Sequence, residues 1–171
     1  MFNTLEFVIL NLNKPIGKGG IHMKISGQLV NSYQVKLDID GFEYLSDQSE
    51  EKGGTNTGTT PHGFLLSSIA SCKIMVAKGY LDHNNLPYER VEMTGNSKIL
   101  GIKRNESIEI NIHLKVFGAH LDEKELGYMT RIVDKGCTMA NILTAGEKNK
   151  VSTTIINGEK DMAQKANNPL D

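Results

Sequence analysis

Two cysteines, Cys72 and Cys137, are the residues of this sequence whose types and settings could carry redox chemistry. Cys72 lies inside the apolar stretch of a predicted helix, where a cysteine either packs as a small hydrophobic side chain or works as a buried thiol. Cys137 follows Gly136, which can end one helix, so it lies near the start of the next, where the helix dipole favours a thiolate. These two unlike settings favour a pair of thiols that work together.

The sequence lacks the motifs of several other chemistries. Its two cysteines and five histidines show no CxxC, HxxxH or HExxH spacing, so no zinc site is predicted. The glycine- and threonine-rich loop at 53–60 lacks the Gly-Lys-Ser/Thr ending of a nucleotide-binding loop. No GxSxG hydrolase motif is present either. Thiol chemistry is therefore the chemistry that the residues favour.

A long helix around Cys72 is the element on which the predicted fold is built. Thr60 can cap it, and Pro61 suits its first position. One apolar stripe recurs at helical spacing and includes the cysteine: Leu65, Ile69, Cys72, Val76 and Tyr80. Other apolar residues widen the stripe, so this helix needs cover on most of its sides: Phe64, Leu66, Ile74, Met75 and Leu81.

Strands and a second helix are predicted on either side of the central helix. Asp40-Gly41 predicts a hairpin turn, and residues 90–100 and 108–116 predict strands, the second alternating strictly between apolar and polar residues. His113 falls on its polar face and is interpreted as a solvated residue. Asp122 can cap a second helix, and residues 150–156 supply a last strand. This order predicts an α+β domain with antiparallel sheets, not alternating βαβ units.

Composition and charge limit the classes of protein that the sequence fits. A chain of 171 residues with 39% apolar residues suits one domain, predicted at 23–156 between an N-terminal extension, 1–22, and a polar tail, 157–171. Its 19 basic residues are balanced by 20 acidic ones and form no basic stripe, so no nucleic-acid partner is expected. The apolar run at 5–10 is too short for a membrane span. Two cysteines fit a reducing cytosol, so a cytoplasmic location is expected.

Three blocks of the sequence resemble the OsmC/Ohr-like family, which includes organic hydroperoxide resistance proteins and their osmotically inducible relatives. SDQSEEKGGTNTGTTP resembles the family's acidic, glycine-rich loop, and PHGFLLSSIASCKIMVAKGY resembles its long helix with the first cysteine. KGCTMANIL resembles the second-cysteine block, and LPYERVEM the strand between them. The resemblance covers residues 24–156.

The resemblance implies a fold, an assembly and a reaction. It implies an OsmC-like fold in which two chains form an intertwined homodimer, with the active sites at the dimer interface. It also implies a peroxidase that reduces organic hydroperoxides or hydrogen peroxide, with Cys72 as the peroxidatic cysteine and Cys137 as the resolving one. No bound cofactor is expected, and an external dithiol, a lipoyl group or a small thiol, would restore the pair. The alternative is a non-enzymatic relative that binds or senses a small apolar molecule at the dimer interface.

The residues that activate the family's cysteine are not matched in this sequence. The family uses an arginine from the N-terminal strands and a glutamate at the start of the cysteine helix. This chain has no arginine before Arg90, and its helix begins Pro61-His62-Gly63. His62 is the candidate replacement, but about 15 Å of helix separates it from Cys72, so it could act only across a dimer interface. Lysines are the other candidates: Lys24, Lys36, Lys135 and Lys73, of which Lys73 is interpreted as a surface residue.

Overall fold

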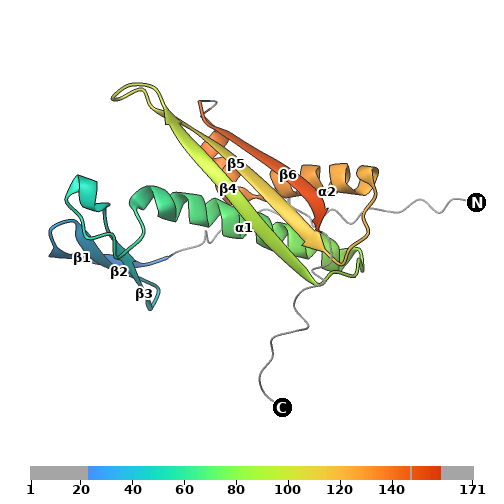
Figure 1. The fold of residues 1–171 in the computed structure, drawn as a ribbon, viewed down its shortest axis with the longest axis horizontal. Helices are drawn as coiled ribbons and strands as arrows, with labels where there is room; N and C mark the ends of the chain where they lie inside the picture. Colours follow the sequence, from blue (N-terminus) through green and yellow to red (C-terminus); the bar gives the residue numbers. More distant parts are fainter. Residues whose placement is uncertain (1–22, 147, 159–171) are drawn as a thin grey trace, which may run out of the picture. The chain divides into compact units, whose positions relative to one another are not determined.

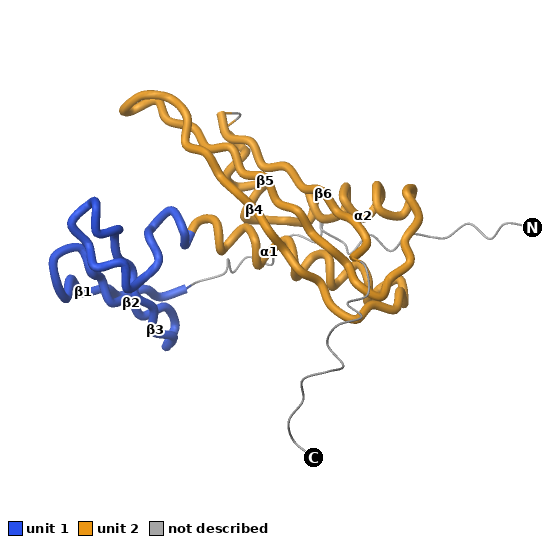
Figure 2. Tube along the Cα trace, viewed as in Figure 1, with its two compact units in different colours: residues 1–64 blue, residues 65–171 orange. Residues whose placement is uncertain are grey.

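The computed structural model describes residues 23–146 and 148–158. The chain divides within its long helix into two compact units, residues 1–64 and residues 65–171, which Figure 2 shows in different colours. The predicted extension at 1–22 lies outside the described residues. So does the predicted tail, except for residues 157 and 158, which continue the last strand.

The first unit contains a three-stranded antiparallel sheet in the order β1-β2-β3. Its strands are β1 (Ile25–Asn31), β2 (Gln34–Ile39) and β3 (Phe42–Ser46), followed by the short 3₁₀ helix Glu50–Lys52. The hairpin predicted at Asp40-Gly41 is confirmed, because these two residues join β2 to β3 with φ angles of 51° and 89°. Positive φ at both central residues is the geometry that suits the twist of a two-residue hairpin.

Helix α1 (Pro61–His83) begins where the sequence predicts. The Thr60 hydroxyl accepts a hydrogen bond of 3.1 Å from the backbone N–H of Gly63, so the predicted cap is confirmed. Helix α1 is long and apolar enough to cross a membrane. The core helix of a globular domain meets the same criteria of length and composition.

The buried face of α1 is rotated about the helix axis relative to the predicted apolar stripe. Its most buried residues are Ile69, Ala70, Lys73, Ala77 and Leu81. Cys72, Val76 and Tyr80 are half-buried and pack against the same core from the side. The prediction is off by about one residue because a helix that is apolar on most sides gives the periodicity no single face to mark.

The second unit contains a three-stranded sheet in the order β4-β5-β6. Strands β4 (Arg90–Leu100) and β5 (Ser107–Phe117) confirm the two predicted strands and pair antiparallel, and β6 (Lys150–Gly158) pairs with β5. The prediction of purely antiparallel sheets is wrong for β6, which runs parallel to β5. The helices α2 (Glu123–Gly136) and α3 (Thr138–Thr144) carry the chain back across the sheet, and such a crossover lets two neighbouring strands run in the same direction.

One face of this second sheet forms the core of the unit. Along β5 the residues Ile108, Ile110, Ile112, Leu114 and Val116 are all buried, while His113 is exposed as predicted. Ile69, Ala77 and Leu81 of α1 and Met129 and Val133 of α2 belong to the same buried cluster. Figure 1 shows the three strands side by side with α1 crossing behind them. The capping residue predicted for α2 is confirmed, since Asp122 and Glu125 form a reciprocal capping box.

Candidate active site

Cys137 lies at the junction of α2 and α3, against the side of α1. It is the last residue before α3, and its sulfur accepts a hydrogen bond of 3.4 Å from the backbone N–H of Ala140. The same sulfur lies 3.9 Å from the carbonyl oxygen of Ile69 in α1, to which the thiol donates. The side chain is fully buried. Its position is therefore fixed both by the start of its own helix and by a turn of the central helix.

Cys72 lies in the same part of α1, and its thiol acts on the ionisation of Cys137. The carbonyl of Ile69 belongs to the helical turn that ends at Lys73, so Cys72 lies on the turn that the Cys137 sulfur contacts. Cys72 is half-buried, and both cysteines are free thiols. The structure thus brings together the two cysteines that lie far apart in the sequence.

The surroundings of Cys137 affect its ionisation in opposite directions. Burial raises the pKa of the Cys137 thiol above its ordinary value, because the interior disfavours the charged thiolate. The Ala140 amide lowers that pKa, the neighbouring Cys72 thiol raises it, and the positive charge of Lys73 lowers it. Burial has the largest effect, so Cys137 is held mainly as a neutral thiol.

Lys73 is a buried residue, and its interpretation as a surface lysine is wrong. Only 1% of its side chain is exposed, and its Nζ lies 2.8 Å from Oδ1 of Asp134 in α2. The hydroxyl of Thr153 in β6 donates a hydrogen bond of 2.5 Å to the same oxygen. Lys73, Asp134 and Thr153 therefore connect α1, α2 and β6 beside the thiol pair. A buried cation of this kind needs such partners, since an unpaired charge is costly to bury.

The other candidate cations lie elsewhere in the chain. His62 is half-buried in the first turn of α1, within the first unit, ten residues before Cys72. Lys24 and Lys36 are exposed residues of the first unit, and Lys36 pairs with Glu43 at 2.6 Å. Lys135 is exposed at the end of α2. Among these candidates and Lys73, the charge that acts on Cys137 is that of Lys73.

A buried aspartate organises the glycine- and threonine-rich loop before α1. The Asp47 side chain is 1% exposed and accepts hydrogen bonds from the backbone N–H groups of Gln48, Thr55 and Thr57. The hydroxyls of Thr55 and Thr57 donate to it as well, at 2.6 and 3.1 Å. These bonds, led by that from the Thr55 side chain, hold the pKa of Asp47 well below its usual range. These hydrogen bonds give the loop a structural role, since they fix its conformation just before α1 begins.

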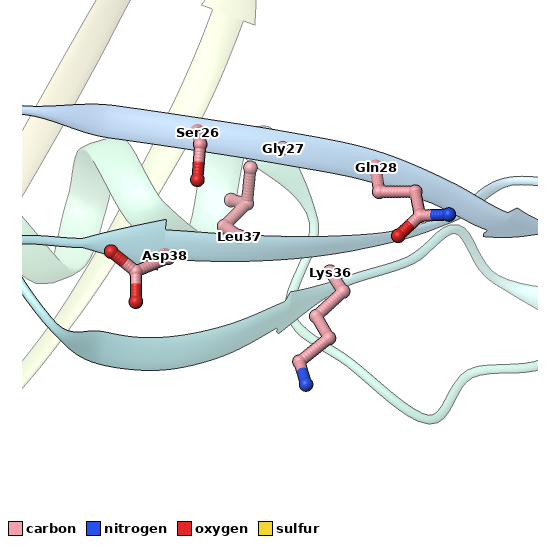
Figure 3. A pocket seen from close by; sticks show the side chains of 6 residues that line it. All are labelled: Ser26, Gly27, Gln28, Lys36, Leu37 and Asp38. Atoms are coloured by element: carbon pink, nitrogen blue, oxygen red, sulfur yellow. The ribbon is translucent and has the colours of Figure 1, made fainter.

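The surface of the first unit carries a solvent-open depression of about 280 Å³ over strands β1 and β2. Figure 3 shows its lining residues, which are Ser26, Gly27, Gln28, Lys36, Leu37 and Asp38. None of these lining residues is buried, and neither cysteine is among them. Within residues 23–146 and 148–158, no group of three or more His, Cys, Asp or Glu side chains could hold a metal ion. The thiol pair is therefore the best-supported candidate for a reactive site in the described chain.

The fold and the thiol pair together define an α+β protein with a dithiol site. The family model of the OsmC-like proteins matches residues 54–152, which include all of α1, both cysteines, Lys73 and Asp134. The chain belongs to the OsmC-like family. A search of curated proteins found no match to this sequence.

Solved structures of low sequence identity share the fold. An OsmC-like protein from Mycoplasma pneumoniae is 18% identical, with a TM-score of 0.69 over 81% of this chain and 99% of that chain. An organic hydroperoxide resistance protein OsmC from Legionella pneumophila is 15% identical, with a TM-score of 0.66 over 81% and 98% of the two chains. An organic hydroperoxide resistance protein from Elizabethkingia anophelis is 15% identical, with a TM-score of 0.67 over 82% and 99%.

Proposed function

We propose that this protein is a thiol-dependent peroxidase that reduces organic hydroperoxides through Cys72 and Cys137. The observation that carries the proposal is the pair of interacting free thiols, one half-buried on α1 and one fully buried at the α2–α3 junction. Membership of a family that includes hydroperoxide resistance proteins supports it. The difference in burial suggests the roles: Cys72 is the thiol that a peroxide reaches, and Cys137 is the resolving thiol.

The proposed cycle has three steps. The Cys72 thiolate attacks the O–O bond of the hydroperoxide, which leaves a sulfenic acid on Cys72 and releases an alkoxide that takes up a proton to become the alcohol. The Cys137 sulfur then displaces hydroxide from that sulfenic acid, forming a disulfide and, after protonation, one water. An external dithiol, such as a lipoyl group, reduces the disulfide to two thiols and is itself oxidised.

The proposal includes the assembly and the setting in which the cycle runs. The protein acts as a homodimer, which is supported by apolar side chains that remain exposed on α1, with Leu65 37% and Met75 69% exposed. It works in the cytoplasm, where thiols are kept reduced and a catalytic disulfide is transient.

Steady-state consumption of tert-butyl hydroperoxide with dihydrolipoamide as the electron donor tests the proposed function. We expect Cys72→Ser to abolish turnover. Cys137→Ser should consume one equivalent of peroxide to form the Cys72 sulfenic acid and about one more as excess peroxide overoxidises it to the sulfinic acid, and then stop. Ser71→Ala is the matched control, since Ser71 is the exposed neighbour of Cys72 on α1 and should leave turnover unchanged. Equal turnover in wild type and Cys72→Ser, or none in wild type, would favour the ligand-binding alternative.

A further inference from the structure

The proposed cycle gives no role to the buried charge of Lys73 beside the thiols. Lys73 is 1% exposed, although a lysine on a helix surface can reach water at little cost. Its ammonium group is held by Asp134, which is itself held by Thr153 on another element. Asp134 is 40% exposed, so the anion of the pair faces water while the cation faces inward.

The Cys137 sulfur lies against the turn of α1 that carries this lysine. It is 3.9 Å from the carbonyl oxygen of Ile69, and in a regular helix that oxygen accepts the backbone N–H of Lys73. Burial opposes the thiolate of Cys137 most strongly, the Ala140 amide favours it, the neighbouring Cys72 thiol opposes it, and the charge of Lys73 favours it. The titratable side chains that act on Cys137 are Cys72 and Lys73 of α1, and the carboxylate of Asp134 in α2 is paired with Lys73.

We propose that Lys73, held in place by Asp134 and Thr153, is a positioning residue whose buried charge stabilises the thiolate of Cys137 when it resolves the oxidised Cys72. The inference rests on the proposed function. In the resolving step the Cys137 thiol first loses its proton to solvent, and the thiolate sulfur then forms the S–S bond as the S–O bond of the sulfenic acid breaks. The leaving hydroxide takes up a proton, so the step needs no further oxidant or reductant.

Two opposing effects decide how much the loss of the Lys73 charge should slow the resolving step: the fraction of Cys137 present as thiolate and the nucleophilicity of that thiolate. If removal of the charge raises the pKa of Cys137 by about one unit, the thiolate fraction below that pKa falls about tenfold. A thiolate of higher pKa is intrinsically more nucleophilic, by about threefold for each unit. The resolving step should therefore slow by about threefold in Lys73→Met, with a correspondingly longer life of the Cys72 sulfenic acid.

The first measurement uses no peroxide, so it does not depend on the proposed activity. In a Cys72→Ser background, the ultraviolet absorbance of the single remaining thiolate gives the pKa of Cys137. We expect Lys73→Met to raise this pKa by about one unit. Asp134→Asn breaks the ion pair but keeps the cation, so it should not raise the pKa. Lys78→Met, which removes the exposed lysine of the Lys78–Asp82 pair on the same helix, should leave the pKa unchanged.

Equal shifts in Lys73→Met and Asp134→Asn would show that the pair is only structural and would overturn the inference, as would no shift in Lys73→Met. If Lys73→Met does not fold, Lys73→Met with Asp134→Asn removes both charges and keeps an acceptor for Thr153, and it is expected to show the same rise.

The second measurement follows the disulfide directly. After rapid oxidation with tert-butyl hydroperoxide, trapping of the sulfenic acid at successive times should show condensation about threefold slower in Lys73→Met than in wild type or Lys78→Met. An unchanged condensation rate would overturn the inference. A wild type that does not react with peroxide would overturn the proposed function alone, because the pKa measurement would still decide the role of Lys73.

Discussion

The Cys137 sulfur lies 3.9 Å from the carbonyl oxygen of Ile69, so the junction of α2 and α3 contacts the central helix directly. This close approach continues at the preceding residue, Gly136, where an added Cβ would lie 2.8 Å from Cγ1 of Val76. The absence of a side chain at Gly136 therefore lets α2 end against α1 with Cys137 beside the turn that carries Cys72.

Gly136→Ala should destabilise the protein. The new methyl group would meet Val76, whose branched side chain has little freedom to move away in a helix. Overpacking of this kind costs about 1–3 kcal/mol, from which the better helix propensity of alanine recovers about 1 kcal/mol at most. Urea unfolding followed by circular dichroism measures the net loss in the free energy of unfolding.

Gly127→Ala in the same helix is the control for this experiment. A Cβ at Gly127 meets no atom within 4 Å, so this substitution should stabilise the protein by about 0.5–1 kcal/mol through helix propensity alone. A Gly136→Ala protein as stable as Gly127→Ala would contradict this prediction, because it would show that α2 can move away from α1 at this point without loss of stability.

The sequence predicts the elements that neighbouring residues specify. Strand β5 follows from the strict alternation along residues 108–116, and the observed strand keeps that alternation. The start of α1 at Pro61 and the capping of α2 by Asp122 follow from side chains that bond to backbone groups three residues away. Such signals are local, so one sequence contains them in full.

The features that depend on distant partners were not predicted. The sequence alone places Lys73 on the surface, because its counterion, Asp134, lies 61 residues away on another helix. The parallel pairing of β6 depends on how α2 and α3 cross the sheet, which strand periodicity does not encode. The two cysteines could be proposed as a pair from their settings and the family resemblance, but only the fold gives the contact between Cys137 and Ile69.

The Asp47 loop should give the protein part of its sensitivity to acid. The pKa of Asp47 is lowered in the folded state, so this group stabilises the fold above its ordinary pKa of 3.8. The stabilisation should be lost progressively as the pH falls below about 4 toward the lower folded value. Thermal unfolding at a series of pH values should show a shallower acid slope in Asp47→Asn than in wild type. Asp40→Asn, at an exposed turn, is the control. Equal slopes in wild type and Asp47→Asn would contradict this assignment.

The exposed apolar surface of α1 predicts that its side chains are covered by a second chain. Met75 is 69% exposed, and Met75→Lys would place a charge in that interface. We expect sedimentation velocity to show a wild-type dimer at micromolar concentration and dimerisation about tenfold weaker or worse in Met75→Lys. Met75→Leu keeps the volume and the apolar character and should remain dimeric. A compact, stable wild-type monomer would argue against the assembly.

Disulfide mapping of the wild-type protein tests the two-cysteine cycle most directly. The reduced protein is given one equivalent of tert-butyl hydroperoxide, and a non-reducing digest is analysed by mass spectrometry. Both free thiols should disappear, and the peptides containing Cys72 and Cys137 should be joined within one chain. Persistence of both thiols, or links formed only at random between chains, would contradict it.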